Sequence, residues 1–165
     1  MSGDEKLTET DPLVRTRSQT MFTRRTRAVL DTNILVAYAL LNGSIARRHD
    51  ALRRCVERVR ADQGLLGSAA TLAELRAVLT RPNFERYQPL ADRQRFFDAI
   101  AAETTLVTPV PDVRLCRDPE DDMFLAAALA SDADWLVTVD RQLLSVRRVG
   151  RTPILRPERA VEQMG

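Results

Sequence analysis

The chain of 165 residues lacks most of the residues on which common enzyme chemistries depend. His49 is the only histidine, which argues strongly against a histidine pair, a Ser-His-Asp triad or a histidine-rich zinc site. Lys6 is the only lysine among 25 basic residues, so arginine carries the rest of the positive charge. Neither GxxxxGK[ST] nor GxGxxG occurs, and a P-loop or dinucleotide-binding function therefore has no support.

Cysteine and long apolar runs are also scarce. The two cysteines, Cys55 and Cys116, match no metal-ligand or redox spacing, which favours reduced thiols. No apolar run approaches membrane-spanning length and the N-terminus is polar, so we expect a cytoplasmic protein without a membrane segment. The net charge of +2 is too small to identify a partner. Arginine suits phosphate, but a GC-rich genome also favours arginine codons, and both explanations remain open.

The arrangement along the chain predicts one domain behind an N-terminal tail. Residues 1–26 are polar and without periodicity, which predicts a disordered tail bearing arginines; an electrostatic arm for nucleic acid is the weaker alternative. Residues 27–165 form the predicted domain. Its expected strands are "AVL", "GLLGS", "TLVTPV", "DWLVTVD" and "TPILRP". Its expected helices cover 34–43, a segment from the N-cap Ser44 to Gly64, 69–79, 89–103, 121–131 and a C-terminal segment with Pro157 near its start.

Strands that alternate with helices predict an α/β fold, a three-layer α/β/α sandwich with a central, mainly parallel sheet. In such sheets, functional sites form beyond the carboxyl ends of the strands. Asp31 follows the first predicted strand, Asp140 ends "WLVTVD", Glu74 lies in the helix after "GLLGS", and Asp122 opens the helix after "CRDPE". We therefore expect these four carboxylates to converge, and their mutual repulsion indicates a hard cation, Mg²⁺ or Mn²⁺.

Each acid also has an ordinary structural explanation. Asp31 could cap the following helix, and Glu74 lies three residues after Thr71, the spacing of a capping box. Acidic residues are common at the start of a helix, which would explain Asp118, Asp121 and Asp122. Asp140 could stand in a simple turn. Caps have no reason to gather at one edge of one sheet, so the four together favour a site.

Four blocks of the sequence resemble a known family. "VLDTNILVAYAL", "LLGSAATLAELRAVLTRP", "CRDPEDDMFLAAALASDADWLVTVDRQLL" and "TPILRPERAV" stand in the order found in PIN domains. They are most similar to the PIN-domain toxins of bacterial toxin–antitoxin modules, close to the VapC type. The resemblance covers about residues 27–162 and leaves the N-terminal extension unmatched.

The resemblance implies a metal-dependent endoribonuclease. Its catalytic and metal-binding acids would be Asp31, Glu74, Asp122 and Asp140, holding one or two Mg²⁺ or Mn²⁺ ions that activate water and neutralise the phosphodiester. Supporting roles fall to residues beside them, either polar groups that orient the acids or members of an acid-rich loop: Asn33, Ser68, Asp118, Asp121 and Thr138. The implied partners are an RNA substrate, a cognate antitoxin and a second copy of the chain in a homodimer.

Other proteins with acids at the ends of parallel strands fit less well. A haloacid-dehalogenase-type phosphatase needs an aspartate at position 33, which is Asn33, and a response-regulator receiver needs a late lysine that this chain lacks. The alternative that stays open is a PIN module that binds nucleic acid or a partner with weak or absent nuclease activity.

Overall fold

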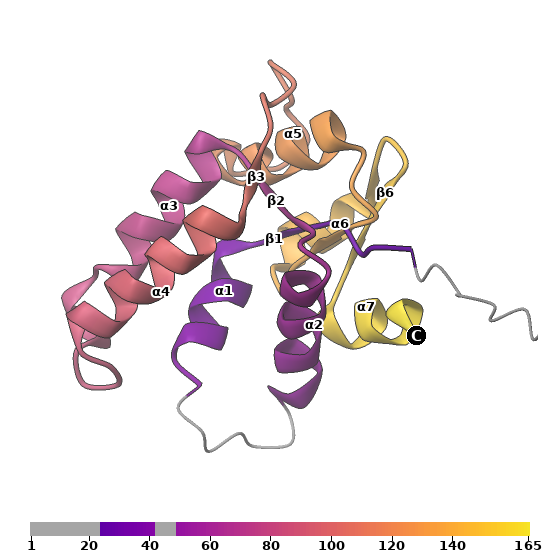
Figure 1. Cartoon of the computed structure of the whole chain (residues 1–165). Helices are drawn as coiled ribbons and strands as arrows, with labels where there is room; N and C mark the ends of the chain where they lie inside the picture. Colours follow the sequence, from indigo (N-terminus) through magenta and orange to yellow (C-terminus); the bar gives the residue numbers. More distant parts are fainter. Residues whose placement is uncertain (1–23, 42–48) are drawn as a thin grey trace, which may run out of the picture.

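The computed structural model describes residues 24–41 and 49–165, in which strands and helices alternate as predicted (Figure 1). The strands of this part are β1 (Ala28–Leu30), β2 (Leu65–Gly67), β3 (Thr105–Leu106), β4 (Trp135–Val137), β5 (Arg148–Val149) and β6 (Thr152–Leu155). The α-helices are α1 (Thr32–Ala39), α2 (Asp50–Ala61), α3 (Ala69–Leu79), α4 (Leu90–Glu103), α5 (Asp122–Ser131), α6 (Arg141–Val146) and α7 (Pro157–Met164). Two short 3₁₀ turns are η2 (Pro82–Phe84) and η3 (Pro119–Asp121).

The strands form one sheet in the order β3-β2-β1-β4-β6-β5. Every neighbouring pair is parallel except β5 and β6, which are antiparallel. The structure therefore confirms the α/β class and the mainly parallel sheet. The candidate acids Glu74, Asp31 and Asp140 follow β2, β1 and β4. These three strands are consecutive in the strand order and therefore lie next to one another.

Alternating side chains along the strands divide the core between the two faces of the sheet. Ala28, Leu30 and Val137 pack with α1, α2, α3, α4 and α7, whereas Val29 and Leu136 pack with α5 and α6. Both faces are covered, as a parallel sheet requires. This is the predicted three-layer sandwich, and in Figure 1 α5 lies across the sheet from α1 and α2.

Several predicted boundaries need correction. The strand predicted at 105–110 is limited to the exposed edge strand β3, where Pro109 has no N–H to continue the ladder. The sequence also did not predict α6 or β5, which are short and lack a clear periodic pattern. The predicted helix start at Ser44 lies outside the described residues, and α2 is described from Asp50.

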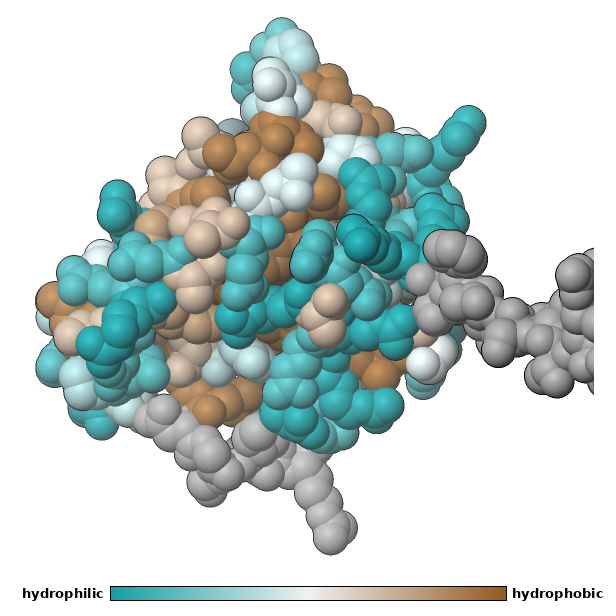
Figure 2. Space-filling view, in the orientation of Figure 1, coloured by the Kyte–Doolittle hydropathy of each residue, from teal (hydrophilic) through white to brown (hydrophobic). Residues whose placement is uncertain are grey.

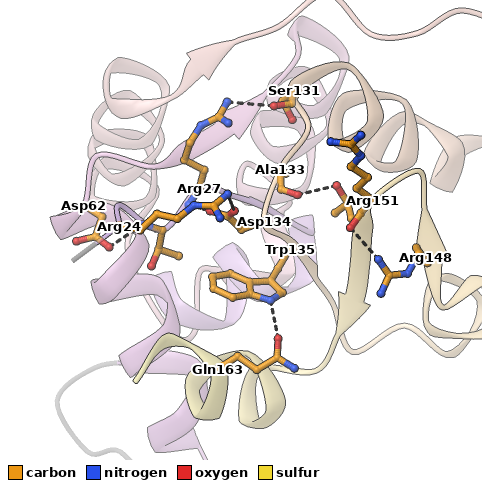
Figure 3. A network of polar contacts seen from close by, with 12 residues as sticks. Arg24, Arg27, Asp62, Ser131, Ala133, Asp134, Trp135, Arg148, Arg151 and Gln163 are labelled. Carbon is orange, nitrogen blue, oxygen red and sulfur yellow. Dashed lines mark hydrogen bonds and ion pairs between the residues drawn. The ribbon is translucent and has the colours of Figure 1, made fainter. Parts of the chain in front are cut away.

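The segment entering β1 is fixed at the amino edge of the sheet (Figure 3). The Thr26 N–H donates to Asp62 Oδ2 at 2.9 Å, after the end of α2. Asp134 accepts from the Arg27 N–H at 2.9 Å and from Arg24 Nη2 at 2.7 Å. Residues 24–26, which the sequence assigned to the tail, are thus hydrogen-bonded to the domain, and residues 1–23 lie outside the described part.

Gly64 allows this close approach. A Cβ at position 64 would stand 1.6 Å from the Thr26 carbonyl oxygen, a backbone atom that cannot move aside easily. The Gly64 carbonyl in turn accepts from the Ala28 N–H at 2.9 Å. Glycine is therefore required where the chain passes from α2 into β2 beside β1.

Two further expectations can be compared with residues 24–41 and 49–165. Cys55 and Cys116 are both free thiols there, as the sequence favours. No helix in these ranges is long and apolar enough to cross a bilayer.

Candidate active site

The carboxyl edge of the sheet carries the candidate acids. Asp31 directly follows β1, Asp140 follows β4 by three residues, and Glu74 lies in α3, the helix after β2. Asp121 ends η3 and Asp122 begins α5. Since β2, β1 and β4 are neighbouring parallel strands, their carboxyl ends bring these segments to one side of the molecule.

Asp31 is the most deeply placed of these acids, with only 4% of its surface exposed. It stands at the N-cap position of α1, but its side chain makes no capping hydrogen bond, so the capping explanation is wrong. Instead Asp31 Oδ2 accepts from Thr138 Oγ1 at 2.7 Å. Burial raises the pKa of this carboxyl above its ordinary value, the Thr138 hydroxyl opposes the rise, and the charges of Glu74 and Asp140 add to it.

Thr138 links two of the acids. Its hydroxyl is fully buried, donates to Asp31 and accepts from the Asp140 N–H at 2.9 Å. Asp140 also caps α6, because its Oδ1 accepts from the N–H groups of Gln142 at 2.7 Å and Leu143 at 3.4 Å. One oxygen of Asp140 thus orders the helix that follows β4, while its charge acts on Asp31.

Glu74 is held by a residue that the sequence did not single out. The buried Thr32 donates from Oγ1 to Glu74 Oε2 at 2.6 Å, across from α1 to α3. The capping-box explanation for Glu74 is wrong, since the box of α3 is formed by Ser68 and Thr71. Position 32 lies beside Asp31, and this adjacency was the only signal available. Asn33, which the sequence favoured, is exposed and makes no hydrogen bond to the acids among the described residues.

The adjacent acids Asp121 and Asp122 face different surroundings. Asp122 is 6% exposed, and its Oδ1 accepts from the N–H groups of Leu115 and Cys116, both at 2.9 Å. It therefore ties the preceding loop to the start of α5. Asp121 is partly buried and lies within reach of the charges of the other acids. Burial raises its pKa to about 6, and the charges of Asp140, Asp118, Asp31 and Glu74 contribute.

The remaining predicted residues have structural contacts. Ser68 is buried, and its Oγ accepts from the Thr71 N–H at 3.2 Å in the capping box. It lines, together with Asp122, a hollow of about 190 Å³. Asp118 is exposed and caps η3 by accepting from the Glu120 N–H at 3.0 Å. Both therefore act in ordering the backbone beside the acids.

The donor set has the chemistry of a site for a hard divalent cation. It consists of carboxylate oxygens without histidine or thiolate ligands, and Mg²⁺ and Mn²⁺ prefer such oxygens. None of these acids forms an ion pair with a basic side chain in residues 24–41 and 49–165, so their repulsion is not offset there. In the same residues no three acid, cysteine or histidine side chains are grouped closely enough to hold a metal as they stand. The fit to Mg²⁺ or Mn²⁺ therefore rests on the chemical type of the ligands, which are carboxylate oxygens.

The chain was compared with known protein families. A family model described as "PIN domain" matches residues 27–142, from the residue before β1 to just beyond Asp140. The chain therefore belongs to the PIN domain family, whose members are typically nucleases and generally use divalent metal ions. The matched range includes every candidate acid, whereas β5, β6 and α7 lie beyond it. A search of curated proteins gave no match to this chain.

Proposed function

We propose that this PIN domain is a divalent-metal-dependent endoribonuclease and the toxin of a toxin–antitoxin module. The observation that carries the nuclease proposal is the set of carboxylates around Asp31. This acid is almost fully buried and faces the charges of Glu74 and Asp140, without a basic partner among the described residues. Buried carboxylates that repel one another lower the stability of a fold, and such groups are typical of sites that bind a cation or carry out a reaction.

Asp31, Glu74 and Asp140 would hold the metal, together with Asp122 or its neighbour Asp121. When bound, the ion would activate water and neutralise charge on the phosphodiester. The protein's own contribution is to orient the ligands. Thr138 fixes one oxygen of Asp31, and Thr32 fixes one oxygen of Glu74, which leaves the other oxygen of each carboxylate free of those bonds. Two acids in one site are thus held in place without an ion pair.

The toxin proposal rests on the resemblance of the four sequence blocks to VapC-type toxins. It includes a cognate antitoxin as partner, a homodimer as the assembled form and the cytoplasm as location. The described surface offers a groove of about 660 Å³ between α3 and α4 that exposes both apolar and charged side chains. Sedimentation at high protein concentration tests the homodimer, and a strict monomer would contradict it.

Purified full-length protein incubated with total RNA tests the enzymatic proposal. Cleavage is expected with Mg²⁺ or Mn²⁺ and is expected to stop with EDTA. It should also be lost in Asp31→Asn, which keeps the side-chain volume and the Thr138 hydrogen bond but removes the charge. Asp132→Asn is the matched control, because Asp132 is exposed at the end of α5, on the amino side of β4, and adopts a φ of 49° that asparagine tolerates.

The companion variants Asp121→Asn and Asp122→Asn compare the two adjacent acids in the same assay. Cleavage that survives EDTA or Asp31→Asn would contradict the proposal. Wild-type protein that binds RNA tightly but cleaves none of it would favour the binding-module alternative.

A further inference from the structure

A basic hollow of about 560 Å³ lies beside the acidic edge, between α6, β6 and α7. Its charged lining consists of four exposed arginines, Arg141, Arg147, Arg156 and Arg159. The other lining residues are Leu144, Ser145, Ile154 and Leu155. Among the described residues the lining thus contains no carboxylate and no aromatic ring.

The hollow continues the sheet edge that carries the acids. Arg141 is the first residue of α6 and directly follows Asp140. Arg156 directly follows β6, the strand that pairs in parallel with β4. Across the carboxyl edge from β1 to β6, the side chains therefore change from Asp31 through Asp140 to Arg141 and Arg156. A ligand lying along this edge meets the acids first and the arginines next.

The positive charge of the hollow is largely uncompensated. Within residues 24–41 and 49–165, Arg141, Arg147 and Arg156 form no ion pair, and only Arg159 does, with Glu162 at 2.7 Å. The arginines of α2 are different: Arg53, Arg58 and Arg60 are each paired with an acid at 2.9 Å or less. The surface over α2, which is hydrophilic in Figure 2, thus presents arginines that are paired with acids, whereas three of the four arginines of the hollow have no ion-pair partner among the described residues.

We propose that this arginine hollow binds the sugar–phosphate backbone of single-stranded RNA next to the bond that is cleaved, an inference that rests on the proposed function. Arginine forks match phosphate oxygens in two-point hydrogen bonds. A polyanion crossing the row of acids needs positive charge close by to offset repulsion. Because no aromatic ring is available for base stacking, these contacts follow the backbone and are independent of base sequence.

The test measures binding of a labelled oligouridylate of about 12 nucleotides to full-length protein by fluorescence anisotropy. EDTA is present throughout, so that binding is read without cleavage. The double variant Arg141→Gln/Arg156→Gln removes two charges from the hollow. The control Arg54→Gln/Arg95→Gln removes two charges from the exposed faces of α2 and α4, where both arginines lie near acids. Circular dichroism and melting temperature establish that all forms are folded.

We expect the hollow variant to bind about tenfold more weakly at low salt, and its slope of log K against log salt to fall by about 1.4, which is two contacts at 0.7 each. The control should stay within about twofold of wild type. Equal loss in both variants, or no loss in the hollow variant, would overturn the inference. Displacement of the RNA by an oligoglutamate of equal charge would overturn it too, because the hollow would then accept any anion, acidic protein segments included.

The outcomes separate this inference from the proposed function. If wild-type protein cleaves RNA with metal while the hollow variant binds as tightly as wild type, the function stands and the hollow inference fails. If wild-type protein cleaves no RNA but its binding depends on Arg141 and Arg156, the nuclease proposal fails and the hollow remains a backbone-binding site.

Discussion

Two regions of the molecule bury charge, and they do so in opposite ways. Arg93, in the first turn of α4, points toward the segment that joins α3 to α4; it is 1% exposed, and all of its side-chain nitrogens are hydrogen-bonded. Its Nε donates to the Gln88 carbonyl at 3.0 Å, and Nη1 donates to the carbonyls of Leu79 at 2.5 Å and Arg81 at 3.1 Å. Its Nη2 donates to Glu85 Oε2 at 2.6 Å. At the sheet edge, Asp31 is nearly as buried, but its charged neighbours are other acids.

The difference separates a charge that the fold itself neutralises from one that is a candidate for a functional role. Arg93 satisfies carbonyls where α3 ends, a place that leaves backbone acceptors without intrahelical partners. Carbonyl oxygens and Glu85 of the same chain neutralise its charge. The acids near Asp31 have hydroxyl partners but no cationic side chain within the described residues, so we expect the neutralising cation to be a bound ion. Burial alone therefore does not make a residue a site candidate; burial without a partner of opposite charge does.

The largest expected effect on stability comes from removing the hydrogen bonds of Arg93. Arg93→Gln is expected to lower the free energy of unfolding by about 2–4 kcal/mol, because one amide group cannot replace the four hydrogen bonds that the guanidinium donates to three carbonyls and to Glu85. Denaturant titration measures this. Arg95→Gln on the same helix is the control, and its effect is expected to stay within about 0.5 kcal/mol, since Arg95 is exposed. Equal midpoints for the two variants would show that Arg93 does not hold the turn.

The second prediction concerns the addition of a divalent cation to the acidic region around Asp31. Saturating Mg²⁺ or Mn²⁺ is expected to stabilise the protein by about 2.7 kcal/mol at a concentration 100 times Kd. Thermal unfolding with metal chloride, compared with KCl of equal ionic strength, measures the gain. The gain should vanish in Asp31→Asn and persist in Asp132→Asn. An equal shift with KCl would reduce the effect to general screening.

The two regions also differ in how far the sequence predicts them. The sequence singles out the acids as candidates because a charged residue directly after an apolar strand is conspicuous, and the ends of neighbouring strands share an edge of the sheet. Arg93 was not found, because an arginine in an amphipathic helix is ordinarily exposed, and only the folded turn supplies its carbonyl partners. The pair Asp121 and Asp122 marks a finer limit. Adjacent helical residues point about 100° apart, and the sequence does not say which one faces the other acids.

The third prediction concerns removal of the Asp31 charge, which has no partner of opposite charge among the described residues. Asp31→Asn is expected to leave the stability of the metal-free protein equal to wild type or higher at pH 7. The reason is that burial and the charges of Glu74 and Asp140 disfavour the ionised form, while asparagine keeps an oxygen for Thr138. Denaturant titration in EDTA measures it. A clear loss of stability would mean that the Asp31 charge has a stabilising partner after all.

The smallest effect concerns pH and Asp121, whose pKa is raised from 3.8 to about 6. Between these values the folded protein binds more protons than the unfolded chain, so this carboxyl makes stability fall as pH rises, and the loss is complete above about pH 6. Asp121→Asn should therefore be more stable than wild type at pH 7 and closer to it at pH 4. Because Asp121 is only partly buried, solvent screening limits the gain to about 1 kcal/mol. Unfolding free energies of both proteins at the two pH values in EDTA give the difference. Added Mg²⁺ should abolish the advantage of the variant by supplying the positive charge that wild-type Asp121 lacks, whereas an advantage that is equal at both pH values would exclude ionisation of Asp121 as its cause.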